Sequence, residues 1–202
     1  MKLVLIDFDG TITTKEVYTK FVLTATHPLR LVLAGLLISP AIVLYKSGLL
    51  PANKMRPLVA RAAFFGVSEK SLTEKAERFV EDYVPTVLRA DMLDTIRGHQ
   101  ENGDRVVVVS ASLSPYLNIW CSQMGIEVLC SDLVVRRGRF TGRYRYGDCS
   151  LYNKVEAVKR HINLSDVSHI TAYGDTHEDF AMLDMANIGV YRGKAYVKNT
   201  GV

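Results

Sequence analysis

The chain has 202 residues, of which 48% are hydrophobic and 23% are charged, and its formal net charge is +4. This composition excludes disorder as the main state, because disordered chains combine low hydrophobicity with high net charge. Three cysteines without paired spacing argue against a disulfide framework or a zinc site. Because the first residues also lack an apolar stretch of signal-peptide length, we expect a cytoplasmic protein.

Short apolar runs alternate with helical patterns along much of the chain. Residues 3–6 and 106–109 are entirely aliphatic, which is typical of strands buried on both faces of a parallel sheet. Three more strands are expected at 126–130, 169–173 and 188–191, and three helices at 115–124, 151–161 and 178–186. This alternation predicts an α/β fold with a parallel sheet.

Residues 14–95 interrupt the alternation, because they contain several helical stretches and no convincing strand. One of them, 69–83, has apolar and charged residues at helical spacing. We therefore predict that a helical cap domain, 14–95, is inserted after the first strand of a core formed by 1–13 and 96–202. The last residues, 192–202, are expected to form a loosely held tail.

The excess of hydrophobic residues is concentrated in 29–50, where 15 of 22 residues are apolar. No charge occurs between Arg30 and Lys46, but a membrane-spanning helix needs about 20 apolar residues and Pro40 interrupts this run. A buried helical hairpin is the leading interpretation. An interfacial membrane patch, making peripheral contact at the inner membrane face, and a transmembrane helix are the alternatives.

Acidic residues follow the first predicted strand, in the sequence Asp7-Phe8-Asp9-Gly10-Thr11. Ligands of parallel α/β sheets bind outside the carboxyl ends of the strands. Carboxylates two residues apart point the same way if the strand continues, and they repel each other unless a cation is present. Oxygen ligands of this kind suit Mg²⁺. An Asx-rich turn is the alternative interpretation.

Two further strands end in groups that can bind phosphate or metal. Ser110-Ala111-Ser112 offers a hydroxyl and backbone N–H groups for a phosphate oxygen, although an ordinary helix cap has the same composition. Asp175 and Asp179 lie four residues apart at a predicted helix start, where a capping box is the alternative. Lys154, near the start of another helix, is in isolation best explained as a solvated lysine.

The order of these groups resembles that of the haloacid dehalogenase (HAD) superfamily. The matching residues run as Asp7-x-Asp9-Gly10-Thr11, then Ser110, then Lys154, then Gly174-Asp175-x-x-x-Asp179. The insertion directly after the first motif is similar to that of the phosphoserine-phosphatase-like branch. The resemblance covers nearly the whole chain and implies a Rossmann-like core with a Mg²⁺-dependent phosphatase activity.

The resemblance also implies roles for individual residues. Asp7 would be the nucleophile that forms an aspartyl-phosphate, and Asp9 the general acid and then the base. Lys154 would offset charge between Asp7 and the phosphoryl group. The phosphate ligands would be Thr11, Ser110 and Ala111. The Mg²⁺ ligands would be Asp7, the backbone carbonyl of Asp9 and Asp175, with Asp179 bound through water or placed behind the ligands.

Substrate-binding residues are suggested by two looser matches to the same branch. Glu16 stands where those enzymes hold a glutamate for the substrate amine, and Arg61 matches their carboxylate-binding arginine. A surface glutamate and an arginine on a helix face are the alternatives. The chain also differs from phosphoserine phosphatases in the residues before Lys154. Those enzymes usually have a glycine-rich segment there, and this chain has Leu151-Tyr152-Asn153.

The apolar run distinguishes two classes of substrate. Residues 27–50 look similar to the hydrophobic segment in the insertion of bacterial phosphatases that act on phosphatidylglycerophosphate. We therefore expect a lipid-type or amphipathic phosphate ester, with a small soluble ester such as phosphoserine or histidinol phosphate as the alternative. A membrane-binding or nucleic-acid-binding module is the non-enzymatic alternative.

A basic hairpin is expected at 133–146, with its turn at Arg137-Gly138. We expect no nucleic-acid partner, although aromatic residues interleave with the arginines as base stacking would need. A solvated hairpin and a flap that attracts an anionic substrate are the other interpretations. Five arginines in this segment account for the basic balance of the chain: Arg136, Arg137, Arg139, Arg143 and Arg145.

Overall fold

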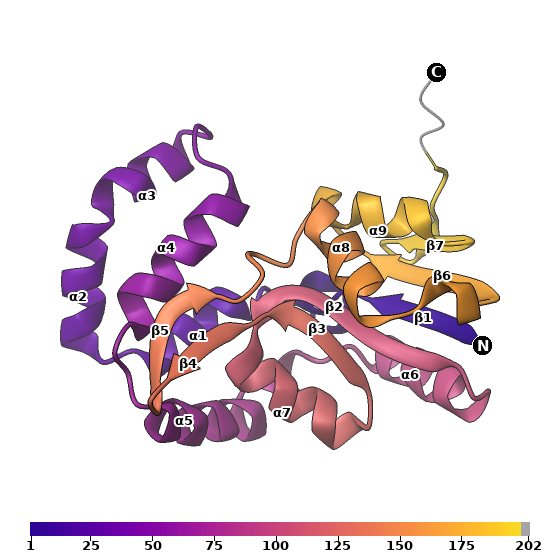
Figure 1. Cartoon of the computed structure of the whole chain (residues 1–202), viewed down its shortest axis with the longest axis horizontal. Coiled ribbons are helices and arrows are strands. Elements are labelled where there is room, and N and C mark those ends of the chain that lie inside the picture. Colours follow the sequence, from indigo (N-terminus) through magenta and orange to yellow (C-terminus); the bar gives the residue numbers. More distant parts are fainter. Residues whose placement is uncertain (199–202) are drawn as a thin grey trace.

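The computed structural model describes residues 1–198 and has a six-stranded sheet at its centre (Figure 1). The strand order is β3-β2-β1-β6-β7-β8, in which all neighbours are parallel except β7 and β8. The strands are β1 (Lys2–Ile6), β2 (Arg105–Leu113), β3 (Glu127–Ser131), β6 (His169–Gly174), β7 (Ile188–Tyr191) and β8 (Lys194–Ala195). The predicted α/β fold with a parallel sheet is confirmed.

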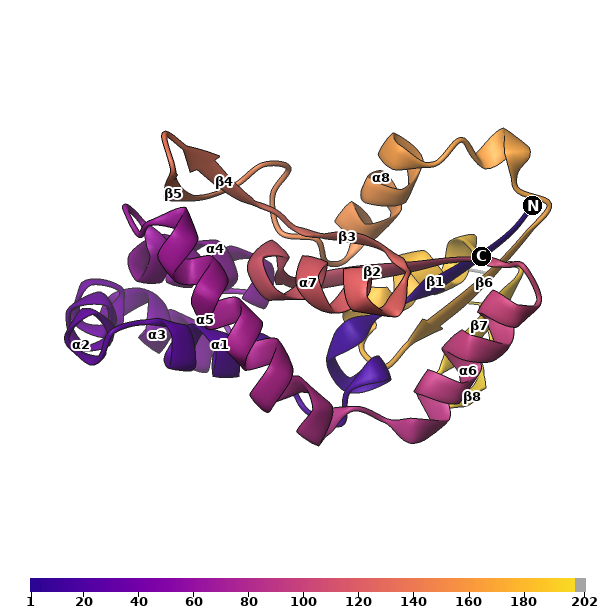
Figure 2. The ribbon, with the colours of Figure 1, turned by 90° about the horizontal axis from the view of Figure 1, so that it is seen from below.

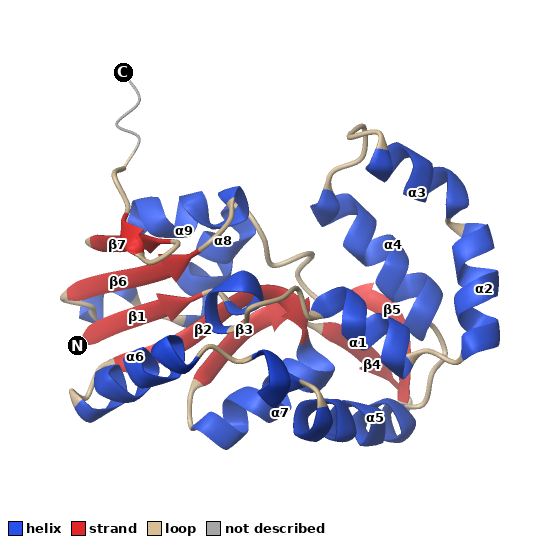
Figure 3. Cartoon of the chain, turned by 180° about the vertical axis from the view of Figure 1, so that it is seen from behind, coloured by secondary structure: helices blue, strands red, loops and turns tan. Residues whose placement is uncertain are grey.

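Helices cover both faces of the sheet, as Figures 2 and 3 show. Val4 and Ile6 of β1 pack in one buried cluster with residues of α6 (Ala90–Glu101) and α7 (Ser114–Met124). Leu3 and Leu5 pack in a second cluster with residues of α8 (Tyr152–His161) and α9 (Phe180–Met185). Because successive side chains of a strand point to opposite faces, only a continuous apolar run satisfies both layers.

Five cap helices lie between β1 and β2 in the sequence and beyond the carboxyl ends of the strands in space (Figure 1). They are α1 (Tyr18–Ala25), α2 (Pro28–Leu37), α3 (Ser39–Lys46), α4 (Ala52–Phe64) and α5 (Glu69–Asp82). The boundary predicted at residue 95 falls inside α6, which packs against β2.

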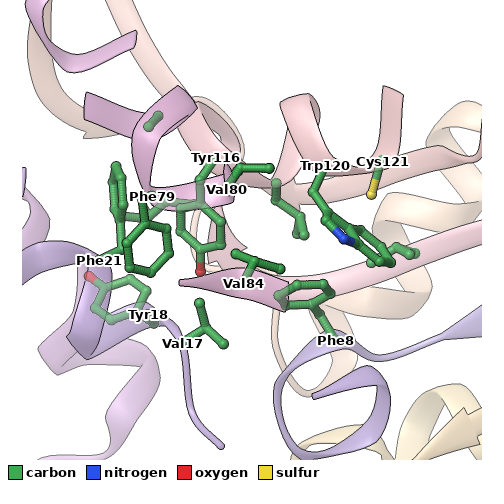
Figure 4. Close-up of a cluster of buried hydrophobic side chains, with 14 of the residues drawn as sticks. Phe8, Val17, Tyr18, Phe21, Phe79, Val80, Val84, Tyr116, Trp120 and Cys121 are labelled. Carbon is green, nitrogen blue, oxygen red and sulfur yellow. The ribbon is translucent and has the colours of Figure 1, made fainter. Parts of the chain in front are cut away.

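An aromatic cluster joins the cap to the core (Figure 4). The ring of Phe21 on α1 lies 5.1 Å from that of Phe79 on α5 and 4.7 Å from that of Tyr116 on α7. Phe8, just after β1, contacts Trp120 of α7 at 5.0 Å between ring centroids. All these side chains are buried, so cap and core share one continuous apolar cluster.

The basic hairpin consists of β4 (Leu133–Arg136) and β5 (Arg139–Tyr144). Its turn lies at Arg137 and Gly138, both with positive φ, as the sequence predicts. The hairpin packs on the cap, because Phe140 exchanges backbone hydrogen bonds with Gly66 and Val67. All five arginines are exposed and none lines the cavity at the carboxyl ends of β1, β2 and β6.

The predicted burial of 29–50 is wrong, because α2 and α3 contain no buried residue. Leu37 is 78% exposed and Val43 is 67% exposed. Hydropathy reports the composition of a helix but not what covers it, and no part of residues 1–198 covers the outer faces of these two. Among residues 1–198, no helix taken alone has the length and apolar composition of a membrane span. Only α2 and α3 taken together reach that length and composition, and they are bent by 70° relative to each other.

The C-terminal segment is held more firmly than the sequence predicts. Tyr196 stacks on Phe180 with 5.7 Å between ring centroids, and its hydroxyl donates to Asp184. The short strand β8 extends the sheet just before it. The part of the predicted tail at 199–202 lies outside the described residues.

The shared aromatic cluster predicts a large cost for Phe21→Ala. The substitution removes a fully buried ring between three other rings, so the free energy of unfolding should fall by about 3–5 kcal/mol. Leu37→Ala is the control, because that side chain is mostly exposed and its loss should change stability by less than about 0.5 kcal/mol. Urea unfolding measures both, and equal losses would contradict the packing described.

Candidate active site

The first motif leaves the sheet at Asp7, whose backbone N–H still donates to the Tyr173 carbonyl at 3.0 Å. The chain then makes one tight turn, Phe8–Ile12, in which Gly10 has a φ of 81°. A Cβ at Gly10 would lie 2.2 Å from Oδ2 of Asp175. Glycine is therefore required here, because the first and last motifs approach too closely for any side chain.

Lys154 is the charge that joins the two acidic motifs. Its Nζ donates to Oδ1 of Asp7 at 2.5 Å, to Oδ1 of Asp179 at 2.6 Å and to the Val109 carbonyl at 2.8 Å. The residue is 1% exposed, and a buried ammonium is tolerated only when it is paired. Burial alone would lower the pKa of Lys154, but the two carboxylates outweigh it and raise the pKa. The solvated lysine that the isolated sequence favours is therefore wrong.

The two carboxylates that share this lysine have pKa values shifted in opposite directions. Burial raises the pKa of Asp7 well above its ordinary value, and the attraction of Lys154 only partly offsets this. Burial acts the same way on Asp179, but Lys154 and the backbone N–H groups of Asp175 and Thr176 outweigh it and lower its pKa. Asp179 is thus held as an anion.

Three carboxylates could hold a metal ion at this edge of the sheet. One ligand oxygen each from Asp7, Asp175 and Asp179 lies within 4.8 Å of the others. Burial raises the pKa of Asp175, and the Thr11 hydroxyl donates to it at 3.3 Å. Three carboxylates facing one lysine leave an excess of negative charge, so the donor set fits a hard divalent cation such as Mg²⁺.

The Asp9 carboxylate is not part of this set, although Asp9 lines the same cavity. It accepts hydrogen bonds from the Val17 N–H at 2.6 Å and from the Ser112 hydroxyl. Burial raises the pKa of Asp9 to about 6, against the opposing effect of these two hydrogen bonds. The Asp9 carboxylate is therefore engaged by Val17 and Ser112 and is not one of the three carboxylates that could share a metal ion.

The serine motif lies within β2 and not after it, because the strand continues to Leu113 past an irregularity in its pairing with β3. Ser110 and Ala111 line the same cavity as Asp7 and Lys154. Ser112 is turned to the other side, where its hydroxyl accepts from Tyr116 and donates to Asp9. No role was predicted for Tyr116, because a tyrosine near a helix start belongs to no recognisable motif.

Arg56 is the site residue that sequence reasoning missed. It projects from α4, donates two hydrogen bonds to Asp148 at 2.8 and 2.9 Å, and pairs with Glu178 at 2.9 Å. These contacts join the cap to the loop before α8 and to the last motif. A local sequence pattern could not predict these contacts, because the partners of Arg56 lie more than 90 residues away in the sequence.

The two predicted substrate-binding residues are placed differently from each other. Glu16 lines the mouth of the catalytic cavity, which has a volume of about 460 Å³. Its carboxylate accepts hydrogen bonds from the Thr19 N–H at the start of α1. Arg61 does not line this cavity and instead borders a separate apolar groove with Leu33 and Phe65.

The close approach at Gly10 predicts that Gly10→Ala weakens cation binding. The added methyl group would displace Asp175, so we expect Mg²⁺ affinity to fall by about 5- to 150-fold, which corresponds to the roughly 1–3 kcal/mol typical of such strain. Gly103→Ala is the matched control, because Gly103 also has a positive φ but nothing lies within 4 Å of its Cβ position. Titration calorimetry measures both, and equal affinities would contradict the geometry.

Comparison with known proteins agrees with this arrangement. Protein CicA of Caulobacter vibrioides is 30% identical over 201 residues, which cover 95% of this chain and 87% of that protein. A Bordetella pertussis protein of unknown function has a similar structure, with a TM-score of 0.73, 21% identity, and coverage of 94% of this chain and 89% of its own.

A probable phosphoserine phosphatase of Vibrio cholerae is also similar, with a TM-score of 0.69, 18% identity, and coverage of 100% of this chain and 62% of its own. At these identities the two solved structures show the fold alone. The family model for haloacid dehalogenase-like hydrolases matches residues 4–184. The match confirms the resemblance carried by the motifs, and the chain belongs to the haloacid dehalogenase-like hydrolase family.

Proposed function

We propose that the chain hydrolyses phosphomonoesters with Mg²⁺, through an aspartyl-phosphate formed on Asp7. The observation that carries this proposal is the contact of Asp7 with Lys154 inside a set of carboxylate oxygens. A carboxylate repels a phosphate dianion, so attack requires cations beside both groups. Lys154 is one such cation, and Asp7, Asp175, Asp179 and the Asp9 carbonyl would hold Mg²⁺ as the other.

The proposed reaction has two displacements at phosphorus. An oxygen of Asp7 attacks, the bond to the ester oxygen breaks, and protonated Asp9 gives its proton to the leaving alcohol. Water then attacks phosphorus and displaces the Asp7 carboxylate, while Asp9 accepts a proton from that water and inorganic phosphate is released. A pKa of about 6 allows Asp9 to serve as acid and then as base near neutral pH. The Ser112 and Val17 hydrogen bonds hold the carboxyl group of Asp9 in place.

Phosphate would be bound by short polar groups around Asp7. We propose the Ser110 hydroxyl, the backbone N–H of Ala111 and the Lys154 ammonium as the donors to its oxygens. The first two residues line the cavity beside Asp7. Thr11, which contacts Asp175, would act from the side of the cation.

The substrate that we propose is an amphipathic or lipid-type phosphate ester. The supporting observation is the exposed apolar surface of α2 and α3, which belong to the same cap as Glu16, Tyr18 and Arg56 of the polar catalytic cavity. A small soluble ester such as phosphoserine or histidinol phosphate is the second candidate, favoured by the fold shared with a probable phosphoserine phosphatase.

We also propose that α2 and α3 contact an anionic membrane surface. Leu29, Leu33, Leu36, Leu37 and Val43 are each at least 59% exposed. No acidic residue occurs between Glu16 and Glu69. This combination of exposed apolar and basic residues is typical of helices that lie in a membrane interface. The basic residues of the same stretch are Lys20, Arg30, Lys46, Lys54, Arg56 and Arg61.

The mechanism predicts that Asp7→Asn abolishes hydrolysis of p-nitrophenyl phosphate, with a loss of several orders of magnitude. EDTA should remove the activity of the unaltered protein, and added Mg²⁺ should restore it. Asp94→Asn is the control, because the Asp94 side chain is 70% exposed and pairs with Arg97 of the same helix. Full activity of Asp7→Asn, or activity that resists EDTA, would disprove the proposed reaction.

The membrane proposal predicts sedimentation of the protein with phosphatidylglycerol vesicles but not with phosphatidylcholine vesicles. The double variant Leu37→Asp and Val43→Asp should bind at least about tenfold more weakly, because burying each side chain stabilises binding by about 1.5–3 kcal/mol. Val197→Asp is the control, since Val197 is 85% exposed but lies far along the chain from α2 and α3. Equal binding of both variants would place the contact elsewhere.

A further inference from the structure

We propose that a second cavity, enclosed by α1, α2, α3 and α4, binds the hydrocarbon chain of the substrate, a proposal that rests on the function proposed above. The cavity has a volume of about 540 Å³, which lies within the range of about 300–1,000 Å³ found for small-molecule sites. Its walls are mainly apolar and include Val22, Leu31, Ile38, Ile42, Met55 and Val59.

This chain cavity adjoins the catalytic cavity. Glu16, Tyr18 and Arg56 line both of them. Glu16 and Arg56 are also the only charged residues among those that line the chain cavity, so its charge is confined to the end that meets the active site. A ligand with its phosphate at Asp7 would therefore extend from a polar site into an apolar one. A phosphate ester that carries an alkyl or acyl chain has the same arrangement, with a polar end and an apolar end.

Small side chains keep the chain cavity open. Ala34 and Gly35 line it from α2, and Ala62 and Ala63 line it from α4. No heavy atom lies within 4 Å of the position that a Cβ would take at Gly35. Protein interiors are otherwise close-packed, and apolar cavities of this kind bind apolar molecules. The space left between α2 and α4 is thus suited to a hydrocarbon chain.

The side chains at the border of the two cavities are held by hydrogen bonds and ion pairs. The Tyr18 hydroxyl donates to the Arg56 carbonyl at 2.7 Å and lies 3.1 Å from the Tyr144 hydroxyl. The Arg56 side chain is held in turn by Asp148 and Glu178. These contacts hold Tyr18 and Arg56 in fixed positions at the border of the two cavities. The polar part of the substrate would end there, and its hydrocarbon chain would begin.

The test uses alkyl phosphates of increasing length, kept below their critical micelle concentrations and without membranes. From propyl to decyl phosphate we expect kcat/KM to rise at least about tenfold, because each buried methylene contributes up to about three- to fourfold. Alkylphosphonates, which cannot be hydrolysed, should bind with affinities that rise in parallel and with a negative heat-capacity change.

Gly35→Leu fills the chain cavity and should lower the decyl-to-propyl ratio of kcat/KM at least about tenfold, since several methylenes lose their site. Gly98→Leu is the matched control. Gly98 lies in helix α6 of the core, and its Cβ position also has open space within 4 Å. The control should leave the ratio unchanged.

The two proposals fail in distinguishable ways. If the esters are hydrolysed with no dependence on chain length and the phosphonates bind equally well, the chain cavity is disproved and the phosphatase stands. If no ester is hydrolysed but phosphonate affinity rises with length and falls in Gly35→Leu, the chain site stands and the phosphatase fails. If the effect of alkyl-chain length appears only above the critical micelle concentration, the cavity is assigned to a bilayer. If it appears only with a second copy of the protein bound, the cavity is assigned to a dimer. Either result overturns the proposal.

Discussion

The ammonium of Lys154, buried between Asp7 and Asp179, is the interaction on which the rest of the site depends. A charge this deeply buried is stable only because two carboxylates and the Val109 carbonyl surround it. Its partners come from β1, from β2 and from the turn after β6, and its own helix α8 covers the sheet. Removing the lysine would take away the positive charge that pairs with both carboxylates and leave them to repel each other.

The cap is tied to this centre by contacts of two kinds. The aromatic cluster around Phe21 and Tyr116 is apolar and holds α1 and α5 on α7. The ion pairs of Arg56 with Asp148 and Glu178 are polar and lie at the mouth of the catalytic cavity. The cap helices α2 and α3 take part in neither set of contacts. They are therefore the part of the cap whose surface remains available to a membrane or to an apolar ligand.

Local patterns in the sequence were enough to predict the sheet and the acidic motifs. Residues 3–6 and 106–109 are apolar at every position because both faces of their strands are covered, and this is visible without the structure. The three aspartates that could share a metal follow strands whose carboxyl ends must meet at one edge. Arg56, Tyr116 and Asp148 could not be found in this way, because their roles arise only from tertiary contacts. The exposure of α2 and α3 escaped prediction for the same reason, since hydropathy is equal for a buried helix and an uncovered one.

Trapping of the intermediate tests whether Asp7 becomes covalently phosphorylated. The protein would be mixed with a phosphate ester and Mg²⁺, quenched, and treated with sodium borohydride, which reduces an acyl phosphate to an alcohol. Peptide mass spectrometry should then find homoserine in place of aspartate at position 7. Modification of Asp9, Asp175 or Asp179 instead, or no modification in protein that turns over the ester, would contradict the role assigned to Asp7.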